Sequence, residues 1–149
     1  MTDDLELLSD DHTLLGSQVI HVVALLKSLS EARLDSAALL AEIMRQIELL
    51  GSQLAEHFAF EEVTVFPQLT HRYPAIGPRL QNLLAQHAEV LAAFNGLISA
   101  IPGDLESPNY SDTIAKSAFF ESVFERHALD ETELLSELAA TPIQISDHK

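Results

Sequence analysis

Residues 47–65, IELLGSQLAEHFAFEEVTV, repeat apolar side chains every three or four positions, which is the spacing of one face of an α-helix. Two polar residues, His57 and Glu61, stand on the same face. Other helices must cover this face, because an isolated amphipathic helix would leave its apolar side in water. The stretch therefore predicts a helical bundle with a polar site inside it.

Three further segments of the chain show the same helical repeat. Turn-forming residues separate the four segments, at 30–35, 74–78 and 102–108, and Asp35 is suited to cap the start of the second helix. No segment alternates with the two-residue period of a strand. We therefore expect an all-α fold, an antiparallel up-down-up-down four-helix bundle, formed by a single domain over residues 1–149. The expected helices span about residues 3–29, 36–69, 78–101 and 112–140.

The composition argues against several classes of protein. The 149 residues include 8 Lys and Arg but 23 Asp and Glu, and the formal net charge of −15 disfavours binding to nucleic acid. The absence of cysteine excludes disulfide scaffolds, thiolate zinc sites and iron–sulfur clusters. The N-terminus lacks the basic segment of a signal peptide, and apolar runs such as residues 22–26 are far shorter than the ~20 residues that span a bilayer. We expect a cytoplasmic protein without nucleic-acid or membrane partners.

Six polar residues stand on the inward, apolar faces of the four expected helices. Each helix carries one histidine on this face, and two of the helices add a glutamate. A buried carboxylate without a counter-charge costs several kcal/mol, and a bound cation removes this cost. Imidazole and carboxylate groups together match the ligands of a transition-metal ion. The candidate metal ligands are His12, His57, Glu61, His87, His127 and Glu131.

The histidine–glutamate pairs are repeated along the chain. His57 precedes Glu61 by four residues, and His127 precedes Glu131 by four, so both side chains of each pair lie on one helix face. A single inward histidine precedes each pair. This order predicts two helical hairpins related by a pseudo-twofold axis, each of which supplies two imidazoles and one carboxylate.

Through the motifs at His12, at residues 57–61, at His87 and at residues 127–131, the sequence resembles the hemerythrin-like proteins, also called the HHE cation-binding domain, over nearly its whole length. The resemblance implies a non-haem di-iron centre in which Glu61 and Glu131 bridge the two irons and the four histidines are terminal ligands. Oxygen-carrying hemerythrins have a further histidine one turn before the position of His87, where this chain has Leu83. This difference leaves one iron with one protein ligand fewer. The resemblance is carried by Asp11-His12, residues 57–62 with Phe66-Pro67, Gln86-His87, and residues 127–135.

The remaining histidines, and the acid that follows Glu61, are expected outside the site. Glu62 lies about 100° round the helix from Glu61, which favours a solvated acid over an additional metal ligand or a partner of one. His21 falls about half a turn away from the inward face, His71 falls in a loop, and His148 falls in the C-terminal tail.

Three functions are compatible with the sequence. The favoured one is a di-iron protein that binds dioxygen or nitric oxide for storage, delivery or sensing. The second is an oxidase, oxygenase or peroxidase that activates oxygen at the iron with fewer ligands. The third is a metal-free bundle whose histidines are structural and which binds a protein partner. Iron is expected ahead of manganese, and zinc is disfavoured because it prefers four ligands to a bridged pair with six.

Overall fold

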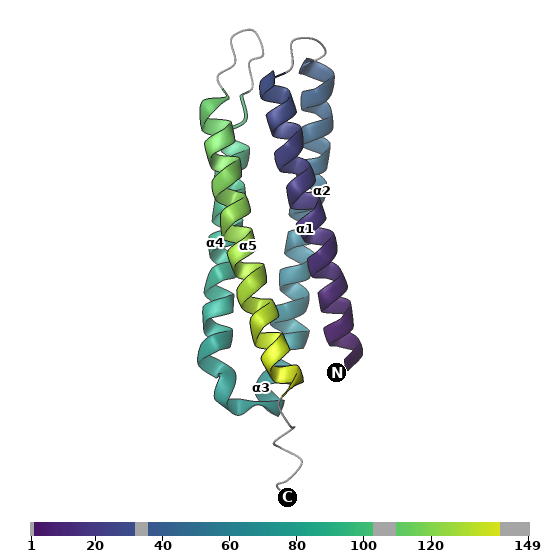
Figure 1. Ribbon diagram of the computed structural model, residues 1–149, viewed down its shortest axis with the longest axis vertical. Helices are drawn as coiled ribbons and strands as arrows, with labels where there is room; N and C mark the ends of the chain where they lie inside the picture. The colour runs from purple at the N-terminus through teal and green to yellow at the C-terminus, as the bar shows by residue number, and fades with distance from the viewer. Residues whose placement is uncertain (1, 32–35, 103–109, 141–149) are drawn as a thin grey trace, which may run out of the picture.

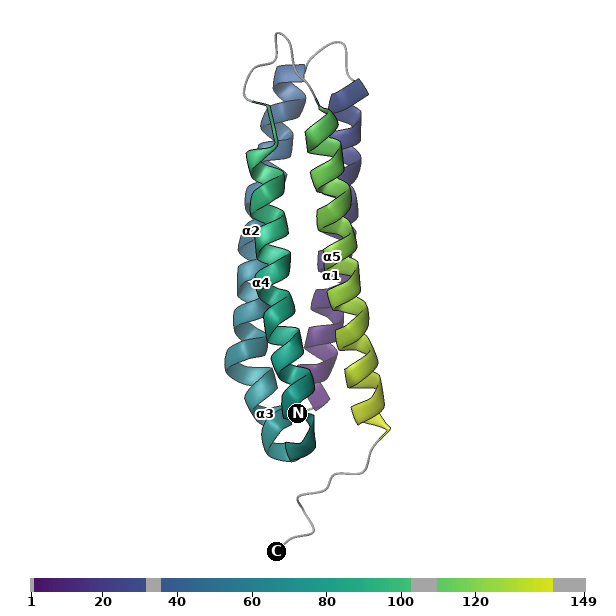
Figure 2. The same cartoon turned by 90° about the vertical axis from the view of Figure 1, so that its left-hand side faces the viewer.

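The computed structural model describes residues 2–31, 36–102 and 110–140, with the side chains of the first segment described from His12 onward. These residues are all helical or connecting, and they form no strand. Figures 1 and 2 show the long helices side by side, with a short helical connection between two of them at one end of the bundle. The long helices are α1 (Thr2–Glu31), α2 (Ser36–Phe60), α4 (Gly77–Ser99) and α5 (Ser111–Ala139), and the connection contains α3 (Phe66–Arg72) and a single 3-10 turn, Pro74–Ile76.

The four long helices surround one interior. Helix α1 contacts α2 and α5, and α4 contacts α5 and, more sparsely, α2. The all-helical prediction with four long helices is confirmed, and the segment expected as the second helix is divided into α2, a π turn and α3. Pro78 lies in the first turn of α4, where a missing N–H costs nothing, and Pro67 lies in the first turn of α3, directly after the π turn. The predicted cap, Asp35, and most of the predicted loop at 102–110 lie outside the described residues.

The second expected helix contains a feature that the sequence pattern did not predict. Residues Glu61–Val65 form a π-helical turn between α2 and α3, in which the backbone N–H of Phe66 donates to the carbonyl of Glu61. A π turn inserts one extra residue into an α-helix, and such insertions occur often at functional sites. Glu61, Val65 and Phe66, at the two ends of this turn, are all buried.

The apolar core of the described residues has two parts, and on α4 and α5 the inward polar residues lie between them. The larger part fills the half of the bundle near the α1–α2 connection. There Gly51 permits a close approach of α4, since a Cβ on it would lie 3.0 Å from Cε2 of Phe94. The larger part includes Val19, Leu26, Ile43, Leu50, Leu54, Val90, Leu97, Phe120 and Phe124. The smaller part consists of Val65, Phe66, Leu69, Leu80, Leu83, Leu134 and Leu138.

One helical stretch, His12–Glu31, is long and apolar enough to cross a membrane by length and composition alone, with a mean hydropathy of 1.3. The uninterrupted apolar runs of the sequence predict no such segment, because His21 and Lys27 break them without greatly lowering the average. In the bundle this stretch supplies buried core side chains, among them Val19, Val22 and Leu26. A core helix of a bundle passes the same composition test, so the finding is weak evidence for a membrane span.

Candidate metal centre

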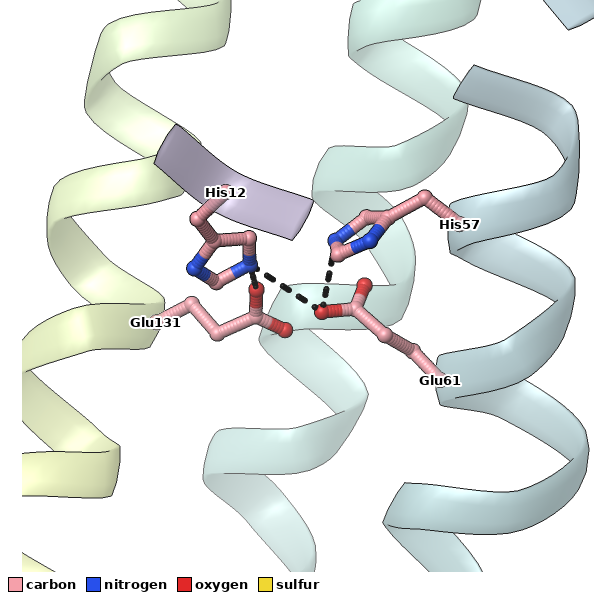
Figure 3. A group of neighbouring side chains, drawn as sticks. All are labelled: His12, His57, Glu61 and Glu131. Carbon is pink, nitrogen blue, oxygen red and sulfur yellow. Dashed lines mark ion pairs between the residues drawn. The ribbon is translucent and has the colours of Figure 1, made fainter. Parts of the chain in front are cut away.

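The six predicted ligands come together at one level of the bundle, contributed by all four long helices and the π turn. His12 comes from α1, His57 from α2, and Glu61 from the first position of the π turn. The site is closed to solvent: five of the six residues are at most 4% exposed, and the His12 side chain is 12% exposed. Figure 3 shows four of them pointing toward one another from the chain's different helices. The other two are His87 of α4 and His127 of α5, the helix that also carries Glu131.

The ligand atoms form two groups that share both glutamates. We call His12, His57, Glu61 and Glu131 the first group, and His87, His127, Glu61 and Glu131 the second group. In each group the donor atoms all lie within 4.8 Å of one another. The two imidazoles of each group come from one predicted hairpin, α1 and α2 for the first group and α4 and α5 for the second, while both glutamates belong to both groups.

The carboxylate of Glu61 contacts imidazoles of both groups. Its Oε2 lies 3.2 Å from Nε2 of His57 and 3.4 Å from Nε2 of His12. Its Oε1 lies 2.7 Å from Nε2 of His87. Both oxygens of this carboxylate are therefore used, one toward each group.

Glu131 occupies the matching position on α5. Its Oε1 contacts Nε2 of His12 closely and lies 4.0 Å from Nε2 of His127. Glu131 thus also reaches one imidazole of each group.

Several of the donor atoms are buried without a hydrogen bond. They are Nε2 of His12, Nε2 of His127, Oε2 of Glu61 and both carboxylate oxygens of Glu131. Buried polar atoms normally have a partner, and an ion is one explanation for a cluster of them that lacks partners. The residues present therefore fit a bound cation, in donor type and in the direction in which their free atoms point.

In the first group the carboxylates and the imidazoles stabilise one another's charged forms. Burial alone would raise the pKa of Glu61, but the neighbouring imidazoles of His12, His57 and His87 hold that pKa well below its usual range. Burial alone would lower the pKa of His12, but the Glu131 and Glu61 carboxylates raise it to about 9. Without metal, Glu61 is therefore an anion and His12 a cation near neutral pH.

The pKa values of Glu131 and His127, the two candidate ligands on α5, are shifted so that the neutral form of each is favoured. Burial, reinforced by the nearby Glu61 carboxylate, raises the pKa of Glu131 to about 8. Burial, with the charges of the other three imidazoles, lowers the pKa of His127 to about 4. A metal ion that binds at neutral pH must therefore displace protons from His12 and Glu131, while His127 is already neutral.

Side chains that the sequence analysis did not assign to the site contact the imidazoles of the second group. Glu62, expected as a solvated acid, is 44% exposed, yet its Oε2 lies 2.7 Å from Nδ1 of His87. Oε1 of Gln86 lies 2.8 Å from Nδ1 of His127, and Nε2 of Gln86 donates to Oδ2 of Asp130 at 2.7 Å. The one signal in the sequence is adjacency, because each of these residues directly follows or precedes a candidate ligand.

Aromatic rings enclose the second group. The ring of Phe58 stacks on His87 with centroids 3.9 Å apart and planes inclined by 12°, and it meets His127 edge-on at 5.5 Å. Phe66 stacks on His87 at 5.8 Å. These contacts restrict the orientation of both imidazoles.

The remaining histidines lie away from the centre where they are described. His21 is exposed on α1, as predicted. His71 is exposed, but it lies in α3 rather than in the predicted loop, because the helix continues through Arg72. His148 lies outside the described residues. Leu83, one turn before His87, is buried in the smaller part of the core.

Four cavities reach the centre or its hydrogen-bonded neighbours. A cavity of about 490 Å³ between α1 and α5 is lined by His12 and by mainly apolar residues that include Gly16, Ile20 and Phe124. A second, of about 440 Å³ between α4 and α5, reaches Gln86 and His127. A third, of about 120 Å³, is lined by Arg79, Asn82, Leu83, Gln86, Asp130, Glu133 and Leu134. The fourth, of about 250 Å³, is lined by His57 together with Leu14, Leu15, Gln53 and Glu56.

Comparison with known protein families gives one match over nearly the whole chain. The family described as the hemerythrin HHE cation-binding domain matches residues 3–139. Comparison with curated proteins and with solved structures found no match.

Proposed function

The chain belongs to the hemerythrin HHE cation-binding family, and from this premise we propose that its buried centre holds two iron ions and binds dioxygen or nitric oxide. In this proposal His12 and His57 hold one ion, and His87 and His127 hold the other. Glu61 and Glu131 bridge the pair. Manganese is the less favoured occupant.

The observation that carries the proposal is the sharing of two carboxylates between two groups of donor atoms. A single ion would need only one group, whereas two groups with both glutamates in common suit a bridged pair. Each ion would receive two imidazoles and two carboxylate oxygens. An ion that takes six ligands would then keep positions open for a small molecule, and the bound pair would supply the electrons for reaction with it.

The surroundings of the centre support a small, uncharged ligand. The core on both sides is apolar, and Leu83 stands where an oxygen-carrying hemerythrin has a histidine. The cavity beside His12 offers an apolar approach to the first group, and His12 is the most exposed of the six residues. A charged or large substrate would meet a bundle interior that is closed to it.

The order of the helices is part of the proposal. We infer the up-down-up-down arrangement of the hemerythrin-like bundle, in which neighbouring helices run in opposite directions. The contacts of α1 with α2 and α5, and of α4 with α5, support it.

The test is anaerobic loading of the metal-free protein with ferrous iron, followed by the optical spectrum before and after exposure to air. A new band that disappears when oxygen is removed supports the binding function. Irreversible oxidation with turnover of peroxide or an organic substrate would instead support the enzyme, which the open positions would also permit. Failure to retain iron, manganese or cobalt would leave the metal-free interaction bundle as the better account.

A further inference from the structure

The hydrogen bonds of Gln86 determine which nitrogen of His127 carries a proton. The amide oxygen Oε1 can only accept, so Nδ1 of His127, 2.8 Å away, must donate to it. A neutral imidazole with a proton on Nδ1 has a bare Nε2. In His127 this Nε2 is buried and has no hydrogen bond. It lies close to the carboxylates of Glu61 and Glu131, which complete the second group.

Asp130 determines the orientation of the Gln86 amide. Its Oδ2 accepts from Nε2 of Gln86 at 2.7 Å. If the amide turned over, its NH₂ group would face Asp130 no longer and would instead point at Nδ1 of His127. That nitrogen would then have to accept, which moves the imidazole proton to Nε2, where it blocks metal binding.

We propose that Gln86 and Asp130 are positioning residues that hold His127 as the Nδ1–H tautomer and so prepare the second group for its metal ion. Neither residue is itself one of the six ligands. The effect on metal affinity rests on the proposed metal function, whereas the tautomer of His127 is a property of the metal-free protein. Partners of this kind around a metal-binding histidine typically change metal affinity by about 10–100-fold.

The position of Asp130 makes the proposal testable without damage to the core. Gln86 and Asp130 are half-buried and line the small cavity of about 120 Å³ between α4 and α5, whose other lining includes Asn82 and Glu133. Their replacement therefore changes a polar edge of the bundle. Gln81, exposed on the same helix, offers a matched control for Gln86.

The first experiment is ¹⁵N NMR of the His127 ring in the metal-free protein at neutral pH, where the two nitrogens of a neutral imidazole give distinct signals. The wild-type protein should show the proton on Nδ1. Gln86→Leu and Asp130→Ala should each populate the Nε2–H form, whereas Gln81→Leu should not. The double variant Gln86→Glu with Asp130→Asn should restore the Nδ1–H form, because a carboxylate at position 86 can accept both from the His127 ring and from an amide at position 130.

The second experiment is anaerobic titration of the same proteins with ferrous iron. Gln86→Leu should weaken one of the two binding events by about 10–100-fold, and the double variant should recover most of the loss. If His127 keeps its Nδ1 proton in both Gln86→Leu and Asp130→Ala, the positioning role is wrong. If the tautomer changes but the wild-type protein binds no metal, the proposed function fails while the assignment of Gln86 and Asp130 stands.

Discussion

The side chains of Glu61 and His87 meet across the bundle, with Oε1 of Glu61 2.7 Å from Nε2 of His87. The two residues are 26 positions apart, one at the start of a π turn and the other in the middle of α4. Since the other oxygen of Glu61 faces His12 and His57, this contact joins the two ligand groups. The same π turn places Glu62 against the far nitrogen of His87.

Removal of a ligand should lower metal content and stability together. We expect His57→Ala or Glu61→Ala to lose at least one of two bound irons per chain, because each removes a donor from a buried group. A bound ligand at 100 times its Kd stabilises the folded state by about 2.7 kcal/mol, and about 2–4 °C of Tm accompanies each kcal/mol in a chain of this size. The melting temperature of the loaded protein should therefore fall by roughly 5–10 °C. Metal analysis and calorimetry measure both quantities.

The matched controls are His21→Ala and His71→Ala, which remove exposed imidazoles. Both should keep the full iron content. Loss of iron in these variants, with retention in His57→Ala, would reverse the assignment of the inward faces.

Metal binding should release protons. The pKa values of about 9 for His12 and about 8 for Glu131 leave both groups protonated at pH 7 in the metal-free protein, and both must lose their protons to bind metal. Affinity should therefore rise by up to about 100-fold per pH unit near pH 7 and level off above pH 9. Calorimetric titration in buffers of different ionisation enthalpy counts the protons, and a count of zero at pH 7 would contradict these pKa shifts.

The stability of the metal-free protein should fall toward alkaline pH. The folded-state pKa of His12 lies above the unfolded value of 6.5, so its contribution is complete below that value and is lost as pH rises through about 9. The raised pKa of Glu131 also makes the folded state less stable as pH rises, over the range from pH 4.5 to about 8. Thermal melts of the metal-free protein from pH 6 to 10 should show a decline in Tm. In Glu131→Gln this decline should be smaller. A Tm that is constant or rises over this range would be inconsistent with a protonated centre.

On the acid side the stability of the metal-free protein should fall only below about pH 4.5. The pKa of His127 is lowered to about 4, so its contribution is lost as pH falls from 6.5 toward 4, but between 6.5 and 4.5 the gain from Glu131 opposes this loss. Below 4.5 that gain is complete, and the lowered pKa of Glu61 adds a further loss. The maximum should therefore lie in the mildly acidic range.

A histidine at position 83 should act as a further ligand of the second group. Leu83 lies one turn before His87 on α4 and is 3% exposed, so Leu83→His buries a polar group and should cost about 1–3 kcal/mol in the metal-free protein. Iron binding should raise the Tm of this variant by more than it raises the Tm of the wild-type protein. The bound iron should also be oxidised more slowly by air. Leu84→His, at the next position, is the control. Equal gains in Tm on loading for all three proteins would show that position 83 does not reach the centre.

The six inward residues could be predicted because each one interrupts an apolar stripe at helical spacing. His57 and Glu61, for example, continue the stripe of Leu50 and Leu54, and the face that such a stripe buries follows from periodicity alone. The long helices follow from the same signal, and proline marks the start of α4.

The outer contacts and the π turn could not be predicted in this way. Gln86 and Asp130 sit about 100° away from the inward face, where the pattern of a single helix predicts solvent, and they meet only because α4 and α5 pack side by side. The π turn at Glu61 arises from one inserted residue, which helical periodicity does not distinguish from a regular turn. The contact of Glu62 with His87 depends on that turn and on the position of another helix.

The presence of a bridged di-iron centre is tested most directly by anomalous X-ray scattering, at the iron absorption edge, from crystals of the iron-loaded protein. We expect two peaks between Glu61 and Glu131, one beside His12 and His57 and the other beside His87 and His127. A single peak, or iron bound away from both glutamates, would contradict this expectation.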